Sequence, residues 1–130
     1  MSSIFTKIIQ GEIPGYKIAE TDDFLAMLDI NPNAEGHTLV IPKKEVDYIF
    51  DMEPETLGGM HQFAQTIAKA LDKAIECKRV GVIVIGTEVP HAHIHLIPFT
   101  SEKQMSFSNP KMKFTSEEFQ ATVKKIQACL

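Results

Sequence analysis

The 130-residue sequence has little cysteine, no excess of positive charge and no long hydrophobic run. Its two cysteines, Cys77 and Cys129, lack the spacing of metal ligands and imply no oxidising compartment, so we expect two free thiols. Thirteen basic residues against 17 acidic ones give a formal net charge of −4, and the lysines are scattered, which disfavours a nucleic-acid polymer as a partner. No segment approaches the length of a membrane span, and the amino end has no basic region before a long apolar run. By default we expect a cytoplasmic protein without a membrane partner.

Length and hydrophobic pattern predict one domain over residues 1–130, with a carboxyl-terminal tail over residues 100–130 that ends in a helix. Apolar residues recurring at three and four predict a long helix over residues 54–76. Thr115 and Glu118 have the spacing of a capping box before the closing helix. One short apolar turn of helix is predicted over residues 5–9. Short strands are predicted over residues 16–20, 24–28, 37–42, 79–85 and 91–98.

Short turns join successive strands except where the long helix intervenes. This order predicts an α+β fold, in which a five-stranded, mainly antiparallel sheet carries one long helix and a carboxyl-terminal helix. Residues 79–85 are β-branched almost throughout, which is typical of a strand covered on both faces. We expect the long helix on one side of that strand and a partner on the other.

Three of the five histidines, His91, His93 and His95, stand at alternate positions of one predicted strand. The period of two points them to one face of the sheet and the apolar residues between them to the other. The plain alternative is the polar outer face of an edge strand. A strand with only that role would not carry three imidazoles without aliphatic cover, so we expect a functional site. His61, on the predicted long helix and away from any other motif, is left out of that site.

Two chemistries use clustered imidazoles, and the spacing alone cannot choose between them. A His-x-His pair with a third histidine holds zinc and leaves one coordination position open for water. Alternatively, one imidazole attacks phosphorus while its neighbours fix its tautomer and donate to charged oxygens. Three alternate residues span about 13 Å of a strand, so they could not all reach one ion without distorting the backbone. The geometry therefore favours the second chemistry.

Residues 91–97, His-Ala-His-Ile-His-Leu-Ile, resemble the signature of the histidine triad (HIT) family of nucleotide hydrolases and transferases. Residues 4–14 are similar to that family's amino-terminal segment, and residues 28–43 are similar to its nucleotide-binding hairpin. The resemblance covers residues 3 to about 99 in the family's order, and the branch that it most resembles is the small nucleoside phosphoramidase type. It implies a HIT-like fold and a homodimer, and we expect no cofactor.

The resemblance implies unequal roles for the histidines. His93 would attack the α-phosphate of an AMP-like purine nucleotide conjugate, a phosphoramidate or a phosphoanhydride, and would carry the nucleotide covalently until water releases the monophosphate. His95 would hydrogen-bond a phosphate oxygen, while His91 and His37 would orient neighbouring groups and support a proton relay. Asp29 matches the carboxylate that binds both ribose hydroxyls, because an ionised carboxylate only accepts hydrogen bonds.

Apolar residues and the loop before the triad complete the implied substrate site. The base pocket would be lined by Phe5, Ile8, Ile13, Met27, Ile30 and Leu39. The phosphate end of the site would be bounded by Thr87, Glu88 and Val89.

The chain also departs from the family pattern. The family often has a glutamine and then a small hydroxyl residue where this chain has Thr87 and Glu88, and its glycine-rich loop is shortened here. A carboxylate beside a phosphate repels it unless it is protonated or turned away, so Glu88 as the acid for an amine leaving group is a hypothesis. Some relatives bind a structural zinc through a Cys-x-x-Cys pair. Ser3 and Thr6 occupy those positions, so we predict no metal.

Two other functions stay open at this point. One is a zinc-dependent hydrolase that uses the same clustered histidines. The other is a nucleotide-binding regulatory or interaction module whose turnover is incidental.

Overall fold

Alternating hydrophobic residues build a five-stranded sheet, which a computed structural model describes within residues 2–130. The strands are β1 (Lys17–Glu20), β2 (Phe24–Leu28), β3 (Thr38–Pro42), β4 (Arg79–Ile83) and β5 (Ile94–Phe99). They lie in the order β1-β2-β3-β5-β4, and every neighbouring pair is antiparallel. The predicted α+β fold with an antiparallel sheet is confirmed.

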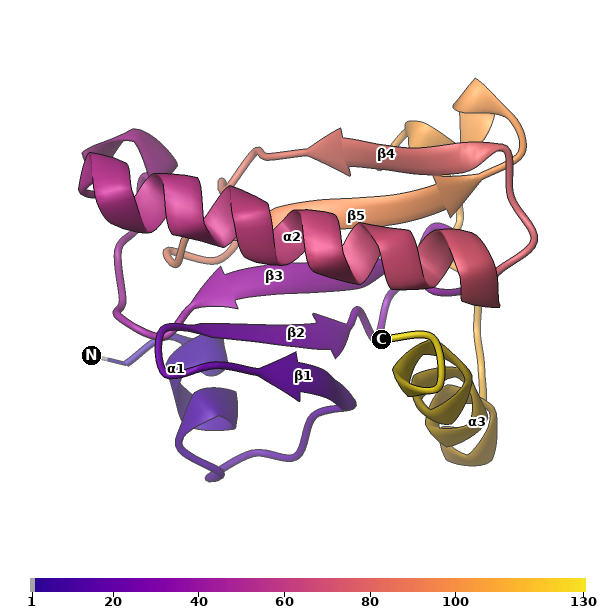
Figure 1. The fold of residues 1–130 in the computed structure, drawn as a ribbon, viewed down its shortest axis with the longest axis horizontal. Helices are drawn as coiled ribbons and strands as arrows, with labels where there is room; N and C mark the ends of the chain where they lie inside the picture. The colour runs from indigo at the N-terminus through magenta and orange to yellow at the C-terminus, as the bar shows by residue number, and fades with distance from the viewer. Residues whose placement is uncertain (1) are drawn as a thin grey trace.

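Helices cover both faces of this sheet. They are α1 (Ile4–Ile9), the 3-10 helix η1 (Ile49–Asp51), α2 (Pro54–Ala74), the 3-10 helix η2 (Glu102–Met105) and α3 (Ser116–Gln127). Figure 1 shows α2 and α3 in front of the sheet and α1 behind it. The predicted capping box of Thr115 and Glu118 begins α3. Within residues 2–130, no helix has the length and hydrophobicity needed to cross a membrane.

The two faces of the sheet carry two separate hydrophobic clusters, because side chains alternate along each strand. On the front face, which α2 and α3 cover, Val40, Ile94 and Leu96 pack with Met60 and Leu71 of α2. On the back face, which α1 covers, the cluster consists of Phe5, Ile8, Leu25, Met27, Leu39 and Ile41. Leu39 and His95 are register partners on β3 and β5, so His95 shares the back face with this second cluster.

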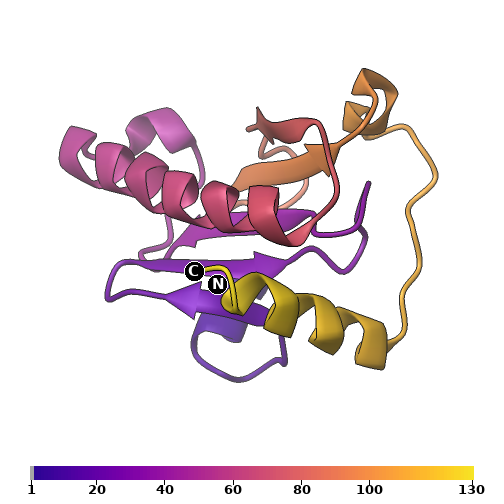
Figure 2. The ribbon, with the colours of Figure 1, turned by 45° about the vertical axis from the view of Figure 1, so that its right-hand side comes forward.

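After β5 the chain passes through η2 and then follows one side of the molecule as an irregular segment until α3 begins (Figure 2). Met105 of η2 covers Gly81 of β4, where an added Cβ would collide with the methionine side chain. Further on, the Met112 N–H donates to the Pro32 carbonyl at 2.9 Å. The segment is therefore fixed both to β4 and to the loop before β3.

The fourth and fifth strands differ from the prediction. Regular pairing of β5 begins only at Ile94, so two of the triad histidines precede the strand. β4 ends at Ile83 and is an edge strand, and Val82 is 58% exposed. Within residues 2–130, the exposed Val82 shows that the chain itself does not cover β4 on both faces, and cover by a partner stays a prediction. The outer edge of β4 is also unpaired within these residues.

Gly36 sets the entry into β3 and generates a stability prediction. Its φ is +83°, and an added Cβ would lie 2.9 Å from Cγ1 of the buried Ile75 and 3.3 Å from Cγ of Pro98. Gly36→Ala should lower the free energy of unfolding by about 2–4 kcal/mol, since left-handed strain adds to overpacking. Gly86→Ala is the matched control, because Gly86 has φ +79° and no heavy atom within 4 Å of its added Cβ. Urea unfolding of both variants checks this, and equal losses would contradict the role of close packing at Gly36.

Candidate active site

Four imidazoles gather on the back face of the sheet. His37 immediately precedes β3, His91 and His93 precede β5, and His95 lies within β5. The ring centroids of His93 and His95 are 4.8 Å apart, and those of His37 and His95 are 5.2 Å apart. Exposure is only 1% for His37, 0% for His91 and 7% for His93. Each ring is therefore governed by protein groups more than by water.

Both ring nitrogens of His91 are engaged by protein groups. Nε2 lies 2.7 Å from the Pro42 carbonyl oxygen, so Nε2 carries the proton and donates it. Nδ1 then accepts a hydrogen bond from the Ser3 hydroxyl at 2.7 Å. Burial lowers the pKa of His91, which favours this neutral tautomer. Neither ring nitrogen of His91 is consequently available to a substrate, since one is bound to the Pro42 carbonyl and the other to the Ser3 hydroxyl.

The amino end of the chain holds His91 in place. The Ser3 N–H and the Thr6 hydroxyl both donate to Oε1 of Glu45, at 2.7 and 2.6 Å. The Thr6 N–H donates to the Ser3 hydroxyl at 3.0 Å as part of the α1 cap. The hydrogen bonds from Ser3 and Thr6 lower the pKa of Glu45 to about 2, so its carboxylate is ionised. Ser3, Thr6 and Glu45 thus form one hydrogen-bond cluster against His91.

His93 presents a lone pair. Its Nδ1 lies 2.8 Å from the backbone carbonyl oxygen of His91, so Nδ1 is the protonated nitrogen. In the neutral ring, Nε2 then has no proton. The ring also packs edge-on against Phe5, with centroids 5.0 Å apart, which limits its rotation. The backbone carbonyl of His91 therefore sets the tautomer of His93 and leaves the lone pair on Nε2.

His37 and His95 form a second directed pair. The Asn33 N–H donates to Nδ1 of His37 at 2.9 Å, which leaves the His37 proton on Nε2. That Nε2 lies 2.9 Å from Nδ1 of His95, so His95 accepts there and carries its own proton on Nε2. Burial lowers the pKa of His37 to about 3 and that of His95 to about 4. Both rings are neutral at pH 7, and His95 offers an N–H donor.

Asp29 lies at the end of β2, beside this pair. Its Oδ2 is 3.5 Å from Nε2 of His37, and its Oδ1 accepts from the Asn31 N–H at 2.8 Å. Burial raises the pKa of Asp29. Its carboxylate oxygens retain lone pairs for further donors, as two hydroxyl groups would require.

Comparison with known proteins identifies this arrangement. The model of the HIT domain matches residues 10–102. The chain belongs to the HIT domain family.

Individual relatives agree with this assignment of the HIT family. Adenosine 5′-monophosphoramidase HNT1 of Saccharomyces cerevisiae is 43% identical over 105 residues, which cover 77% of this chain and 64% of the yeast protein. Adenosine 5′-monophosphoramidase hnt1 of Schizosaccharomyces pombe is 33% identical over 134 residues, which cover 98% of each chain. A solved structure of a HIT-like protein from Bartonella henselae has a TM-score of 0.87 at 36% identity and covers 99% of this chain and 96% of that one. The predicted family and fold are confirmed.

One group in this HIT domain has the composition of a metal site. Ligand atoms of Asp29, His37 and His95 lie within 4.8 Å of one another, and within residues 2–130 no other group of three does so. The group contains only one triad histidine, so the three triad imidazoles do not converge on one ion. In addition, Nε2 of His37 and Nδ1 of His95 are hydrogen-bonded to each other. We therefore do not assign this group to a metal.

The predicted apolar residues of the substrate site divide into two sets. Phe5, Ile8, Met27 and Leu39 are buried in the back-face cluster, and Ile13 and Val89 pack against it. Ile30 is 62% exposed. The structure brings the first set together beside the histidines, while Ile30 lies outside their cluster.

The loop before the triad lies at the surface. Thr87 and Glu88 are both exposed. The negative charge of Glu88 nevertheless contributes to the raised pKa of Asp29, so Glu88 is close enough to act on the site electrostatically.

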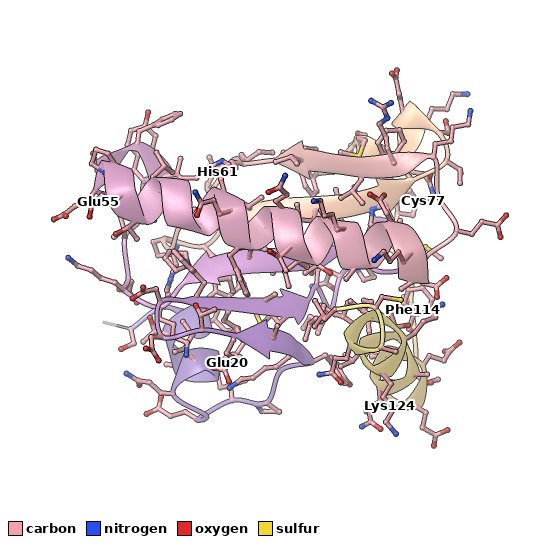
Figure 3. The ribbon with its side chains drawn as sticks, in the orientation of Figure 1. Glu20, Glu55, His61, Cys77, Phe114 and Lys124 are labelled. Carbon is pink, nitrogen blue, oxygen red and sulfur yellow. The ribbon has the colours of Figure 1, made fainter. Side chains whose placement is uncertain are left out.

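A cleft of about 510 Å³ reaches His93 from the front of the molecule. Its lining includes Thr87, Tyr48, Phe50 and also His61, which sequence reasoning left out of the site. Figure 3 shows His61 at the edge of α2 nearer to β4. The sequence carried no signal for this placement, because the cleft is formed by η1, α2 and the loop after β4, which are separate in the chain.

The lowered pKa values of His37 and His95 generate a stability prediction. The unfolded chain takes up these protons near pH 6.5, whereas the folded protein does so only near pH 3 and 4, so acid favours unfolding. Lowering the pH from 7 to 5 should reduce the free energy of unfolding by about 2 kcal/mol per histidine. Asp29, with its raised pKa, opposes this trend at lower pH. In urea unfolding, the free energy of unfolding should fall less steeply with decreasing pH for His95→Asn than for the wild type. His61→Asn, which changes an exposed histidine, is the control and should behave like the wild type. An unchanged slope in His95→Asn would contradict the lowered pKa of His95.

Proposed function

We propose that this HIT-family protein is a nucleotide hydrolase that acts at the α-phosphate of an AMP-like purine nucleotide conjugate. The observation that carries the proposal is the pairing of a free Nε2 lone pair on His93 with a protonated Nε2 on His95. The relatives named as adenosine 5′-monophosphoramidases support a phosphoramidate as substrate. A phosphoanhydride is chemically related, since it too has a leaving group on the α-phosphate.

In the first step, Nε2 of His93 forms a bond to the α-phosphorus while the bond from phosphorus to the leaving nitrogen or oxygen breaks. The His91 carbonyl keeps its hydrogen bond to Nδ1–H and stabilises the positive charge that develops on the ring. His95 donates from Nε2 to a nonbridging phosphate oxygen. Glu88 gives a proton to the leaving atom.

In the second step, water attacks phosphorus and the bond to His93 breaks, which restores the Nε2 lone pair. The carboxylate of Glu88 takes a proton from the attacking water, so the acid of the first step becomes the base of the second. Asp29 accepts hydrogen bonds from the two ribose hydroxyls. The base lies against Phe5, Ile8, Ile13, Met27 and Leu39, and Ile30 and Val89 flank it.

The covalent intermediate makes the proposal testable. Wild-type protein and His95→Ala should each gain one AMP in intact mass during incubation with an AMP amine conjugate, because His95 only assists the step. His93→Ala should gain none and should lose about 10³-fold or more in turnover. Lys124→Ala, which changes an exposed side chain on α3, should keep both adduct and turnover.

Two outcomes would overturn this mechanism. Stoichiometric zinc that is lost together with activity on chelation, without any AMP adduct, would indicate a zinc-dependent hydrolase at Asp29, His37 and His95. Nucleotide binding without adduct or turnover would indicate a regulatory or interaction module.

We also propose that the protein acts in the cytoplasm as a homodimer joined along β4. Support comes from the outer edge of β4, which is unpaired within residues 2–130, and from Val82 and Ile85, which are 58% and 54% exposed. An exposed apolar edge strand readily pairs with another copy.

Light scattering with size exclusion tests the homodimer. The wild type should have twice the mass of the chain, and Val82→Lys should shift it to the monomer, because the charge opposes burial of the edge. Ile4→Lys, at a residue on α1 that is 48% exposed, should leave the dimer intact. A wild-type monomer at all concentrations would contradict the proposal.

A further inference from the structure

The end of η2 and the irregular chain that follows it pass directly beside the site. We call this stretch, residues 104–112, the tail segment. Phe107 is its partly buried centre, with its ring centroid 4.7 Å from that of His95 and 6.2 Å from that of His37. Phe107 thus covers the same hydrogen-bonded pair that supplies the N–H donor of the site.

Lys111 holds Phe107 from its other side. Its Nζ lies 4.8 Å from the Phe107 ring centroid, and it donates to the Phe107 carbonyl at 3.3 Å. The same Nζ donates to Oδ1 of Asn33 at 2.6 Å. Lys111 therefore links the tail segment to the loop that precedes β3.

Asn33 connects the tail segment to the histidine pair. It is 6% exposed, and its side-chain N–H groups donate to the carbonyls of Gln104 and Ser106 at 2.9 and 3.1 Å. Its backbone N–H is the donor that fixes the proton of His37 on Nε2. One residue thus binds the tail segment with its side chain and sets the His37 tautomer with its backbone.

We propose that Phe107 and Lys111 are positioning residues, which act through Asn33 and His37 to keep the Nε2 proton of His95 aimed at the substrate phosphate. Phe107 excludes water from the His37–His95 hydrogen bond, so that neither nitrogen exchanges its protein partner for solvent. Lys111 and Asn33 lock Phe107 in that place. The catalytic consequence rests on the proposed function, whereas the effect on the imidazole pair does not.

The charged groups around this pair determine what a loosened tail segment would do. Asp29 and His37 lie on the loop side, His93 lies beside His95 on the β5 side, and Lys111 comes from the tail segment. Burial is the main cause of the lowered pKa of His37 and His95, and the positive charge of Lys111 lowers both values further. Loss of this burial or of the Lys111 charge should therefore favour protonated rings or mixed tautomers.

Imidazole ¹⁵N NMR of the substrate-free protein gives the direct test. The wild type should show both rings with the proton on Nε2. Phe107→Ala should give mixed tautomers and bring both titrations closer to the ordinary histidine value of about 6.5. Phe107→Leu should stay near the wild type, because it keeps apolar cover, and so should Lys113→Gln, which removes an exposed lysine from just beyond the tail segment.

Turnover of an AMP amine conjugate gives the second readout. Phe107→Ala should lower kcat about tenfold or more with a smaller change in KM, and Phe107→Leu should restore most of kcat. If Phe107→Ala does not fold, Lys111→Gln, which removes the lock and keeps the ring, should move the NMR spectra in the same direction. Unchanged tautomers in both Phe107→Ala and Lys111→Gln would overturn the inference, and so would equal changes in Lys113→Gln. If no nucleotide conjugate is turned over by the wild type, the proposed function fails while the NMR comparison still decides the positioning role.

Discussion

Backbone groups decide where the imidazole protons lie, and the chemistry of the site depends on that. A neutral imidazole has one proton and two nitrogens, so a single fixed hydrogen-bond partner determines the behaviour of the whole ring. The Pro42 carbonyl does this for His91, the His91 carbonyl for His93 and the Asn33 N–H for His37. A backbone group is part of the sheet or of a turn that leads into it. The proposed nucleophile, His93, and the proposed donor, His95, are therefore as well ordered as the fold itself.

Burial reinforces this arrangement. Removing the His37 and His95 rings from water disfavours their charged forms, so these two rings stay neutral at a pH where solvated histidines would be partly protonated. Neutrality matters because a protonated His95 could not accept a hydrogen bond from His37. The hydrophobic cluster of the back face and Phe107 of the tail segment thus both shield the imidazoles from water.

The sequence predicted those parts that depend on local periodicity. The alternation of residues 91–96 correctly separated the triad from Ile94 and Leu96, because a side-chain period of two persists in extended chain even where no partner strand pairs. The long helix and the α3 capping box were also predicted from spacing alone. The family motif then placed Asp29 and His37 beside the triad, where the structure has them.

What escaped prediction depends on contacts between distant segments. Nothing local marks Asn33 as the residue that joins the tail segment to His37, since its partners Gln104 and Ser106 lie 71 and 73 residues further along the chain. Nor does any local pattern mark Glu45 as the acceptor for Ser3. The cleft that includes His61 is likewise assembled from elements that are separate in the chain. Such residues become visible only when the sheet has brought the segments together. Polar residues in irregular segments, such as Asn33 and Glu45, accordingly make hydrogen bonds that hold the site together, although their sequence context does not indicate this.

Ser3 stands almost at the beginning of the chain, yet its hydroxyl is 2.7 Å from a nitrogen of the fully buried His91. Ser2 is already exposed. Only Met1 and Ser2 would separate an affinity tag or fusion partner attached at this end from the side chain that holds His91. The carboxyl end, which follows α3 at the front of the sheet, is the better place for an attachment in quantitative work.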